Sequence, residues 1–436
     1  MEPTKTKPFT LIVLAAFGML ALVGLFLFAH FKGFNSGTQI GSVTIWGTLP
    51  QQAVANEISA LQTAHREYSG ITYVQVPPDS FESDLAEALA VGNGPDLILI
   101  SQEDLLAEQN KLAVIPYKNI SQRTFIDTFV PITELYLTDQ GTYGIPFAVD
   151  PLVMYYNRTL LESAGIAQPP TTWEAVGGMA ERLTSRSGGQ LTKSLIAFGE
   201  YQNVPNARGI ISLLLLQAGS KISQATTLGM QSSMLQSSAG VTYGSSPSES
   251  AINFYTQFAD PAKTVYSWNG SMLDARQAFQ SGDLALYFGY ASELPYIRAA
   301  NPNLDFDMAS VPQPATSAHR ITYAKAYAFA IPKRSNNPNG ALSVAFALAN
   351  TDIAPSTAAA LSMVPAARAA LTPSPQDRFQ PVYFPEALVA EGWLSPSPAT
   401  TDRIFAAMIG SITSGRADLS QALATADQAL DAALKP

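Results

Sequence analysis

The chain has 436 residues, a hydrophobic fraction of 47 % and a formal net charge of −9 at pH 7, and it contains no cysteine. The missing cysteines exclude disulfides, thiolate nucleophiles, cysteine-based zinc sites and a lipid-modified cysteine anchor. The acidic balance argues against nucleic acid or an anionic surface as a partner. The length and hydrophobic fraction favour two packed globular domains.

The first predicted element is a membrane-spanning helix. Leu11–Ala29 carries no charge over nineteen residues, close to the roughly 20 that cross a bilayer. Lys5 and Lys7 precede it, so the N-terminus is expected in the cytoplasm and the rest of the chain outside. A cleaved signal peptide or a buried core helix is the alternative, but Phe26–Phe31 offers no small-x-small cleavage site. We predict an uncleaved single-pass anchor at the cell membrane, with a linker ending at residue 38.

Strands and helices alternate directly after this linker. Buried strands are expected at Val43–Trp46, Ile71–Val76 and Leu97–Ile100, with helices over Gln51–Glu67 and from Asp79 between them. This β-α-β-α-β order predicts an α/β domain with a largely parallel sheet.

Two capping boxes are predicted, Asp79 with Glu82 and Thr171 with Glu174. The second begins a helix that runs to about Leu183. We expect Trp173 to pack at the start of that helix and to serve stability rather than ligand binding.

A second unit, in which strands and helices again alternate, is expected to begin near Val149. Gly219–Ser250, rich in Ser, Gln, Thr and Gly, is expected to be a long loop or ragged hairpin. The other expected elements are strands at Leu152–Tyr156, Leu195–Gly199, Leu284–Phe288 and Tyr327–Ile331, and helices at Arg158–Ala164, Ile210–Gln217, 339–350 (capped by Asn337-Pro338) and in the tail 402–434.

No catalytic or metal-binding motif stands out. The three histidines have no zinc spacing, and the sequence has neither a G-x-S-x-G elbow nor a G-x-x-x-x-G-K-[ST] phosphate loop. We therefore assign no catalytic residue, metal or cofactor. A hydrolase with paired carboxylates stays open, because Asp150, Glu200 and Asp274 are distant in sequence yet free to meet in space.

Aromatic residues recur at the ends of the expected strands, at Trp46, Phe147, Tyr201 and Tyr290. Ligands of open α/β sheets bind outside the carboxyl ends of the strands. Flat rings with Asp, Glu or Asn nearby suit a neutral polyhydroxylated ligand, although each ring taken singly is as well explained as core filler.

A set of short motifs resembles the extracellular solute-binding proteins of ABC importers, of the maltose-binding (family 1) type. The specific block comprises Tyr143–Pro146, Tyr155–Arg158, Ala164–Ile166 and Pro170–Glu174. Weaker matches are Phe81, Leu85 and Leu89 with Gly94–Asp96, then Ala278–Leu286, Tyr327–Lys333 and Asn336–Leu348. The chain departs from the family in lacking the lipid-anchor cysteine and in placing Ala291 or Ser292 where an aromatic is frequent.

The resemblance implies a two-lobed, type II periplasmic-binding-protein-like α/β fold that closes by a hinge motion. The chain would cross between lobes near Pro146–Pro151, Val311–Pro314 and Pro365–Pro375. The implied lobes are residues 39–147 with about 312–366, and 148–311 with about 367–436. The implied partners are a small solute, an ABC permease and a separate ATPase.

Three functions are compatible with this sequence. The leading one is a membrane-anchored solute-binding component of an importer, binding a sugar or oligosaccharide between the lobes. An extracytoplasmic enzyme acting on polysaccharide and a ligand sensor for a membrane receptor are the alternatives. The expected ligand-binding residues come from segments that the two-lobe topology brings to one cleft: Trp46, Asp150, Glu200, Tyr201, Trp268 and Tyr290.

Overall fold

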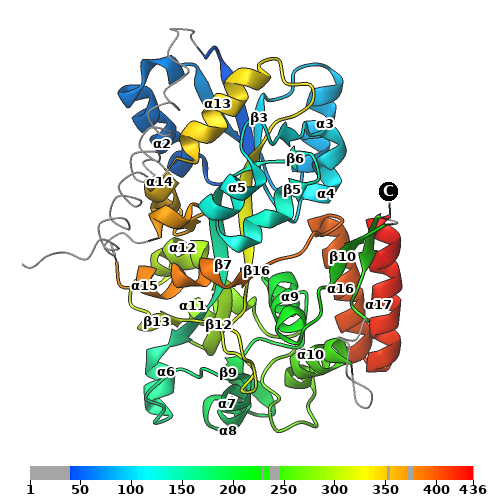
Figure 1. Ribbon diagram of the computed structural model, residues 1–436. Coiled ribbons are helices and arrows are strands. Elements are labelled where there is room, and N and C mark those ends of the chain that lie inside the picture. Colours follow the sequence, from blue (N-terminus) through cyan, green and yellow to red (C-terminus); the bar gives the residue numbers. More distant parts are fainter. Residues whose placement is uncertain (1–39, 228, 236–245, 351–353, 372–376, 436) are drawn as a thin grey trace, which may run out of the picture. The chain divides into compact units, whose positions relative to one another are not determined.

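A computed structural model describes residues 40–435, apart from 228, 236–245, 351–353 and 372–376 (Figure 1). Gly41–Pro436 forms one compact unit by its own contacts. Within the described residues, no helix has the length and apolar character needed to cross a bilayer. The predicted anchor, Leu11–Ala29, lies outside the described residues.

The first lobe is built on three parallel strands, as the sequence predicts. The central strand β1 (Val43–Gly47) pairs with β2 (Ile71–Gln75) on one side and β3 (Leu97–Ser101) on the other. The connecting helices are α2 (Gln51–Ala64) and α3 (Phe81–Ala90).

Four more helices and a small three-stranded sheet complete this lobe. The helices α13 and α14 come after the chain has returned from the second lobe. Asn337 caps α13 as predicted, because the Asn337 side chain accepts a hydrogen bond from Gly340 N. The elements are α4 (Leu105–Glu108), α5 (Gln122–Thr128), α13 (Pro338–Leu348), α14 (Ala354–Ala360) and a small sheet of β4 (Ile115–Pro116), β6 (Gly141–Thr142) and β5 (Leu137–Thr138).

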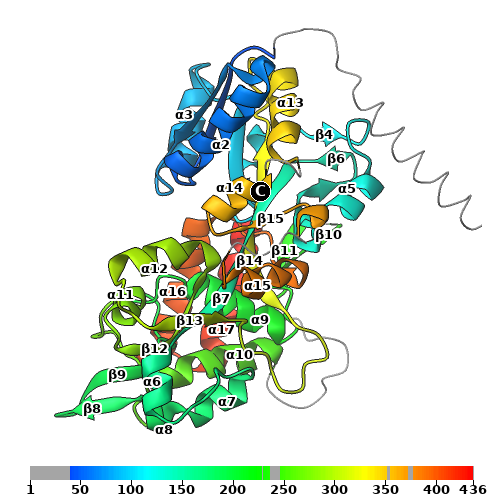
Figure 2. The same cartoon turned by 90° about the vertical axis from the view of Figure 1, so that its left-hand side faces the viewer.

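Two long strands carry the chain between the lobes. β7 (Ile145–Asn157) and β14 (Thr322–Ala330) run antiparallel and pair with each other in the middle of one sheet of order β2-β1-β3-β14-β7-β12-β9-β8. Figure 2 shows β7 passing from the first lobe into the second. Because β7 and β14 are shared by both lobes, a closing motion must bend or twist these two strands.

The third passage of the chain follows β15 (Val364–Pro365), which pairs with Val149 and Ala148 of β7. Arg368 still contacts the first lobe, where its Nε donates to Phe129 O, whereas α15 (Gln380–Tyr383) contacts β13 of the second lobe. The residues at which each lobe begins and ends stay a prediction.

The second lobe pairs β12 (Leu284–Tyr290) with β7 on one side and with β9 (Gln190–Ile196) on the other. β12 and β9 are parallel, so their carboxyl ends lie at the same edge. The remaining elements are β8 (Ser185–Ser187), β13 (Phe306–Ala309), β16 (Ala390–Glu391), α6 (Arg158–Ser163), α7 (Trp173–Gly178), α8 (Ala180–Leu183), α9 (Ala207–Gln217), α10 (Pro247–Thr256), α11 (Ala275–Gln280) and α12 (Leu294–Ala300).

The C-terminal tail forms two helices, α16 (Pro398–Thr413) and α17 (Leu419–Leu434), which pack against each other and against α10 (Figure 1). The polar segment before α10 contains a hairpin, β10 (Ser223–Thr226) with β11 (Gly229–Ser232), which contacts α17. The expected ragged hairpin is therefore present where this segment is described.

Both predicted capping boxes are wrong in detail. The cap position of α3 is Ser80 rather than Asp79, and its side chain makes no capping hydrogen bond to the helix. The cap of α7 is Thr172, one residue later than predicted, and its Oγ1 accepts from Ala175 N. Glu174 instead turns outward to accept from Ala315 N, so the box geometry is not available to it.

Candidate ligand-binding site

The carboxyl ends of the parallel strands in the two lobes come together at one place. β3 ends at Ser101, and Glu103 follows two residues later. In the second lobe β12 ends at Tyr290, and α9 presents Arg208 on its first turn. Glu103 and Arg208 are in direct contact, so the two strand edges meet in the position where α/β sheets bind ligands.

Four charged side chains form the centre of this junction. Arg208 donates to Glu103 from both Nε, at 3.2 Å, and Nη2, at 3.0 Å, and from Nη1 to Asp402 of α16. Lys325 of β14 places its Nζ 4.0 Å from a Glu103 oxygen, and the Tyr323 hydroxyl also donates to Glu103. We call these five residues the junction cluster.

Glu103 is 2 % exposed, so its charge depends on these neighbours. Burial alone would raise the pKa of the carboxyl, but Arg208 and Lys325 together with the hydrogen bonds lower it to about 2. Burial would likewise lower the pKa of Arg208, yet Glu103 and Asp402 hold it well above its usual value. Glu103 and Arg208 are therefore both charged at neutral pH.

Asp150 and Tyr290, two of the expected site residues, border the junction cluster. The Lys325 ammonium lies 4.3 Å from the centre of the Tyr290 ring, a cation–π contact. Asp150 lies opposite Lys325 in the β7–β14 register and accepts hydrogen bonds from Ser292 N at 3.0 Å and Ser292 Oγ at 2.6 Å. Burial raises the pKa of Asp150 to about 7, even though the Ser292 bonds and Lys325 lower it.

Tyr201 contacts the junction cluster through Asp402, to which its hydroxyl donates a hydrogen bond at 2.5 Å. The neighbouring Glu200 is half-buried beside Gly270, and burial raises the pKa of its carboxyl. Asp150, Tyr201 and Tyr290 thus lie around one set of charges, although they are distant in the chain.

The two tryptophans among the expected site residues, Trp46 and Trp268, make no contact with these charges in the hydrogen bonds and ion pairs described above. Trp46 lies one residue before the end of β1, and its side chain is partly exposed. Trp268 is fully buried, with its Nε1 donating to Asn203 Oδ1 at 3.1 Å. The sequence also suggests a turn at Asn269-Gly270 that would expose the Trp268 ring, and this expectation is wrong, because the ring packs inside the second lobe and Asn203 satisfies its indole N–H. A ligand contact by either ring stays a prediction.

Sequence reasoning missed Glu103, Arg208, Lys325 and Asp402. One signal was present for Arg208, which is the only charged residue in the otherwise apolar α9. A lone cation in such a helix needs a buried partner or a functional reason. Nothing in the local sequence points to the partners, because they lie 105 and 194 positions away.

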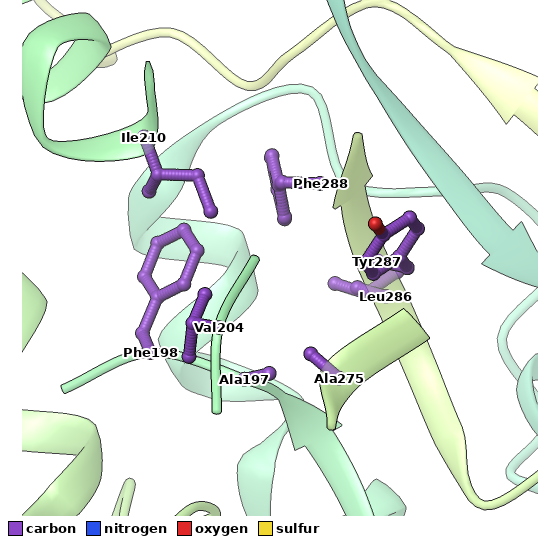
Figure 3. Close-up of a pocket in the computed structure, with 8 residues that line it drawn as sticks. All are labelled: Ala197, Phe198, Val204, Ile210, Ala275, Leu286, Tyr287 and Phe288. Carbon is purple, nitrogen blue, oxygen red and sulfur yellow. The ribbon is translucent and has the colours of Figure 1, made fainter. Parts of the chain in front are cut away.

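Two hollows are lined by residues outside the junction cluster. The first hollow lies under the second-lobe sheet and leaves no volume for a water molecule, so it is part of the core rather than a ligand site. Figure 3 shows the residues that line it: Ala197, Phe198, Val204, Ile210, Ala275, Leu286, Tyr287 and Phe288. The second holds about 300 Å³ between Pro131–Leu135 and β16–Gly392, with Glu134 and Glu391 on its wall. This volume lies at the lower end of small-molecule pockets.

Residues 58–379 match the family described as bacterial extracellular solute-binding protein. This chain belongs to that family. The family is one of solute-binding proteins rather than enzymes, so the polysaccharide-acting enzyme is set aside as an alternative. The resemblance seen in the sequence motifs is confirmed.

A putative binding protein of Brucella abortus is 32 % identical over 128 residues, which cover 28 % of this chain and 30 % of that protein. The chain therefore aligns with less than a third of this relative.

Among solved structures, the cyclic α-maltosyl-1,6-maltose binding protein of Arthrobacter globiformis has a TM-score of 0.73 at 18 % identity, covering 90 % of this chain and 99 % of that one. An ABC transporter solute-binding protein of Thermotoga lettingae, bound with α-D-tagatose, has a TM-score of 0.69 at 20 % identity, covering 90 % and 100 %. These likenesses confirm the two-lobed α/β fold.

Proposed function

We propose that this solute-binding protein captures a neutral sugar or oligosaccharide between its two lobes and delivers it to an ABC permease driven by a separate ATPase. The observation that carries the proposal is the meeting of the strand ends of both lobes at the junction cluster. A solute bound there contacts both lobes at once and therefore favours their closure.

The chemistry of the junction favours an uncharged solute. Arg208 is neutralised by Glu103 and Asp402, and Lys325 by Glu103 and the Tyr290 ring. A charged solute would have to break one of these pairs, whereas hydroxyl groups can share them as additional hydrogen-bond partners. Saccharides also appear with the relatives of the same fold, among them the maltosyl-maltose binding protein and the tagatose complex.

Trp46 is the ring that we expect to stack on the sugar. Replacing Trp46 with alanine should weaken binding by roughly 1–3 kcal/mol, or about five- to 150-fold in Kd, because stacking and burial of one ring face are lost. Titration calorimetry on the full chain in detergent measures this, with the saccharide that raises the melting temperature most as the titrant.

Tyr68→Ala is the matched control for this titration. Tyr68 is a partly exposed ring in the same lobe, but it lies before the start of β2, at the end of the sheet away from the strand carboxyl ends. Equal losses of affinity in the two variants, or no loss in Trp46→Ala, would contradict the assignment of Trp46 to the site.

We further propose that Leu11–Ala29 stays in the mature protein and ties it to the cell membrane with the N-terminus inside. The nineteen uncharged residues and the absence of a cleavage site support this proposal. Mass spectrometry of the protein from its native membrane is expected to find peptides from residues 1–10. A mature N-terminus beyond residue 30 would overturn the proposal.

A further inference from the structure

We infer that Glu103 and Arg208 form a latch that holds the two lobes together before any solute is bound. Glu103 follows β3, one of the three parallel strands of the first lobe, and Arg208 lies in the first turn of α9 in the second. Their contact is bidentate, with Nε and Nη2 of the guanidinium on the two carboxylate oxygens. This fork geometry gives both strength and a fixed orientation to the pair.

The contact is shielded from water. The side chain of Glu103 is 3 % exposed and that of Arg208 is 16 % exposed. Charges in such surroundings are weakly screened by salt, so the attraction between them acts at nearly full strength. Opening the lobes must separate the two groups and rehydrate both.

Each member of the pair has a further partner besides the other. Arg208 retains Asp402, on a helix that packs in the second lobe with α9 and α17. Glu103 also accepts a hydrogen bond from the Tyr323 hydroxyl and lies 4.0 Å from Lys325, both on β14, the strand that the two lobes share. Neither charge is left buried without a partner, which is the arrangement that makes breaking a buried pair costly. The latch therefore opens reversibly, and it sets the balance between open and closed forms rather than locking one of them.

The latch changes how the solute is recognised, whichever solute it is. A protein that samples the closed form without ligand has its binding surfaces already partly assembled, and the solute stabilises that form. Weakening the latch should shift the empty protein toward the open form.

The distance between the lobes in the empty protein tests this inference. The chain has no cysteine, so Val91→Cys and Lys193→Cys place two spin labels without a background site. Both positions are exposed, Val91 at the end of α3 and Lys193 on β9, one in each lobe and both away from the junction. Pulsed dipolar spectroscopy on the full chain in detergent, with no sugar added, gives the distance distribution.

Glu103→Gln in the labelled background is expected to add a longer-distance population or to make it dominant. Glu108→Gln is the matched control, because Glu108 is equally buried but pairs at 2.9 Å with Lys111 in the same lobe. That variant should keep the parent distribution. Arg208→Gln breaks the same pair from the other side and should reproduce the longer population if Glu103→Gln does not fold.

Parent-like distributions in both Glu103→Gln and Arg208→Gln would overturn the latch. Because no solute is present in this experiment, its result is independent of whether the protein binds sugar. A sugar that binds the parent protein while both variants keep the parent distances would leave the proposed function intact and remove the latch alone.

Discussion

Replacing Trp173 with alanine is expected to lower the free energy of unfolding by about 3–5 kcal/mol, the range for deleting a large buried aromatic side chain. Trp173 is 5 % exposed and packs on Phe198, Phe254 and Phe288 with ring centroids 5.9, 5.3 and 5.4 Å away. Its Nε1 also donates to Gln217 Oε1 at 2.7 Å. Truncation would leave a cavity between α7 and the second-lobe sheet.

Urea unfolding followed by circular dichroism measures this loss. Trp173→Phe separates ring packing from the hydrogen bond to Gln217, because it keeps an aromatic ring in the cluster but removes the donor. This variant should lose about 1 kcal/mol of unfolding free energy for the hydrogen bond, plus a smaller amount for the lost packing. An alanine variant as stable as the parent that no longer binds solute would show that Trp173 is a ligand residue and not, as its packing indicates, a stabilising one.

Stability should depend on pH through Asp150. Burial raises the pKa of this carboxyl from 3.8 to about 7 in the folded protein. A group with a raised pKa binds more protons in the folded than in the unfolded state between these two values. Its favourable contribution is therefore complete below about pH 4 and is lost as the pH rises to 7, by a total on the order of 4 kcal/mol.

Asp150→Asn should remove this part of the pH dependence and make the variant relatively more stable at pH 8 than at pH 4. The comparison is the difference in unfolding free energy between variant and parent at each pH, so other titrating groups cancel. Glu103 contributes with the opposite sign, mainly between its folded pKa of about 2 and its unfolded value of 4.5, and this contribution is present in both proteins and cancels in the comparison. A difference that stays constant from pH 4 to pH 8 would show that Asp150 ionises normally.

Local sequence patterns predicted most of the elements because those patterns report burial. Phe81, Leu85 and Leu89 recur at helical spacing and are all buried, and the short apolar runs became β1, β2 and β3. The prediction failed for the crossing strand, which was expected to begin at Leu152. Pro146 and Pro151 interrupt its pattern, yet both are paired with β14, where the register shifts between Tyr327 and Ala328.

The candidate site was only partly predictable, for a different physical reason. Strand-end positions pointed to Tyr201 and Tyr290, since topology alone places strand ends at one edge, and the expected lobe crossing pointed to Asp150. The charges that organise the junction come from β3, α9, β14 and α16, and their pairing depends on how the chain crosses between the lobes. Periodicity and capping carry no information on such long-range pairs, so Glu103 and Arg208 became visible only in the structure.

The melting temperature of the full chain with and without a panel of saccharides tests the central claim most directly. Ligand that binds only the folded form stabilises it by about 2.7 kcal/mol at a hundredfold excess over Kd. We predict that at least one neutral mono- or oligosaccharide raises the melting temperature in a saturable way, and that amino acids, phosphate and charged sugar acids do not. Stabilisation by a charged solute alone would contradict the proposed neutral saccharide ligand, as would no stabilisation by any saccharide.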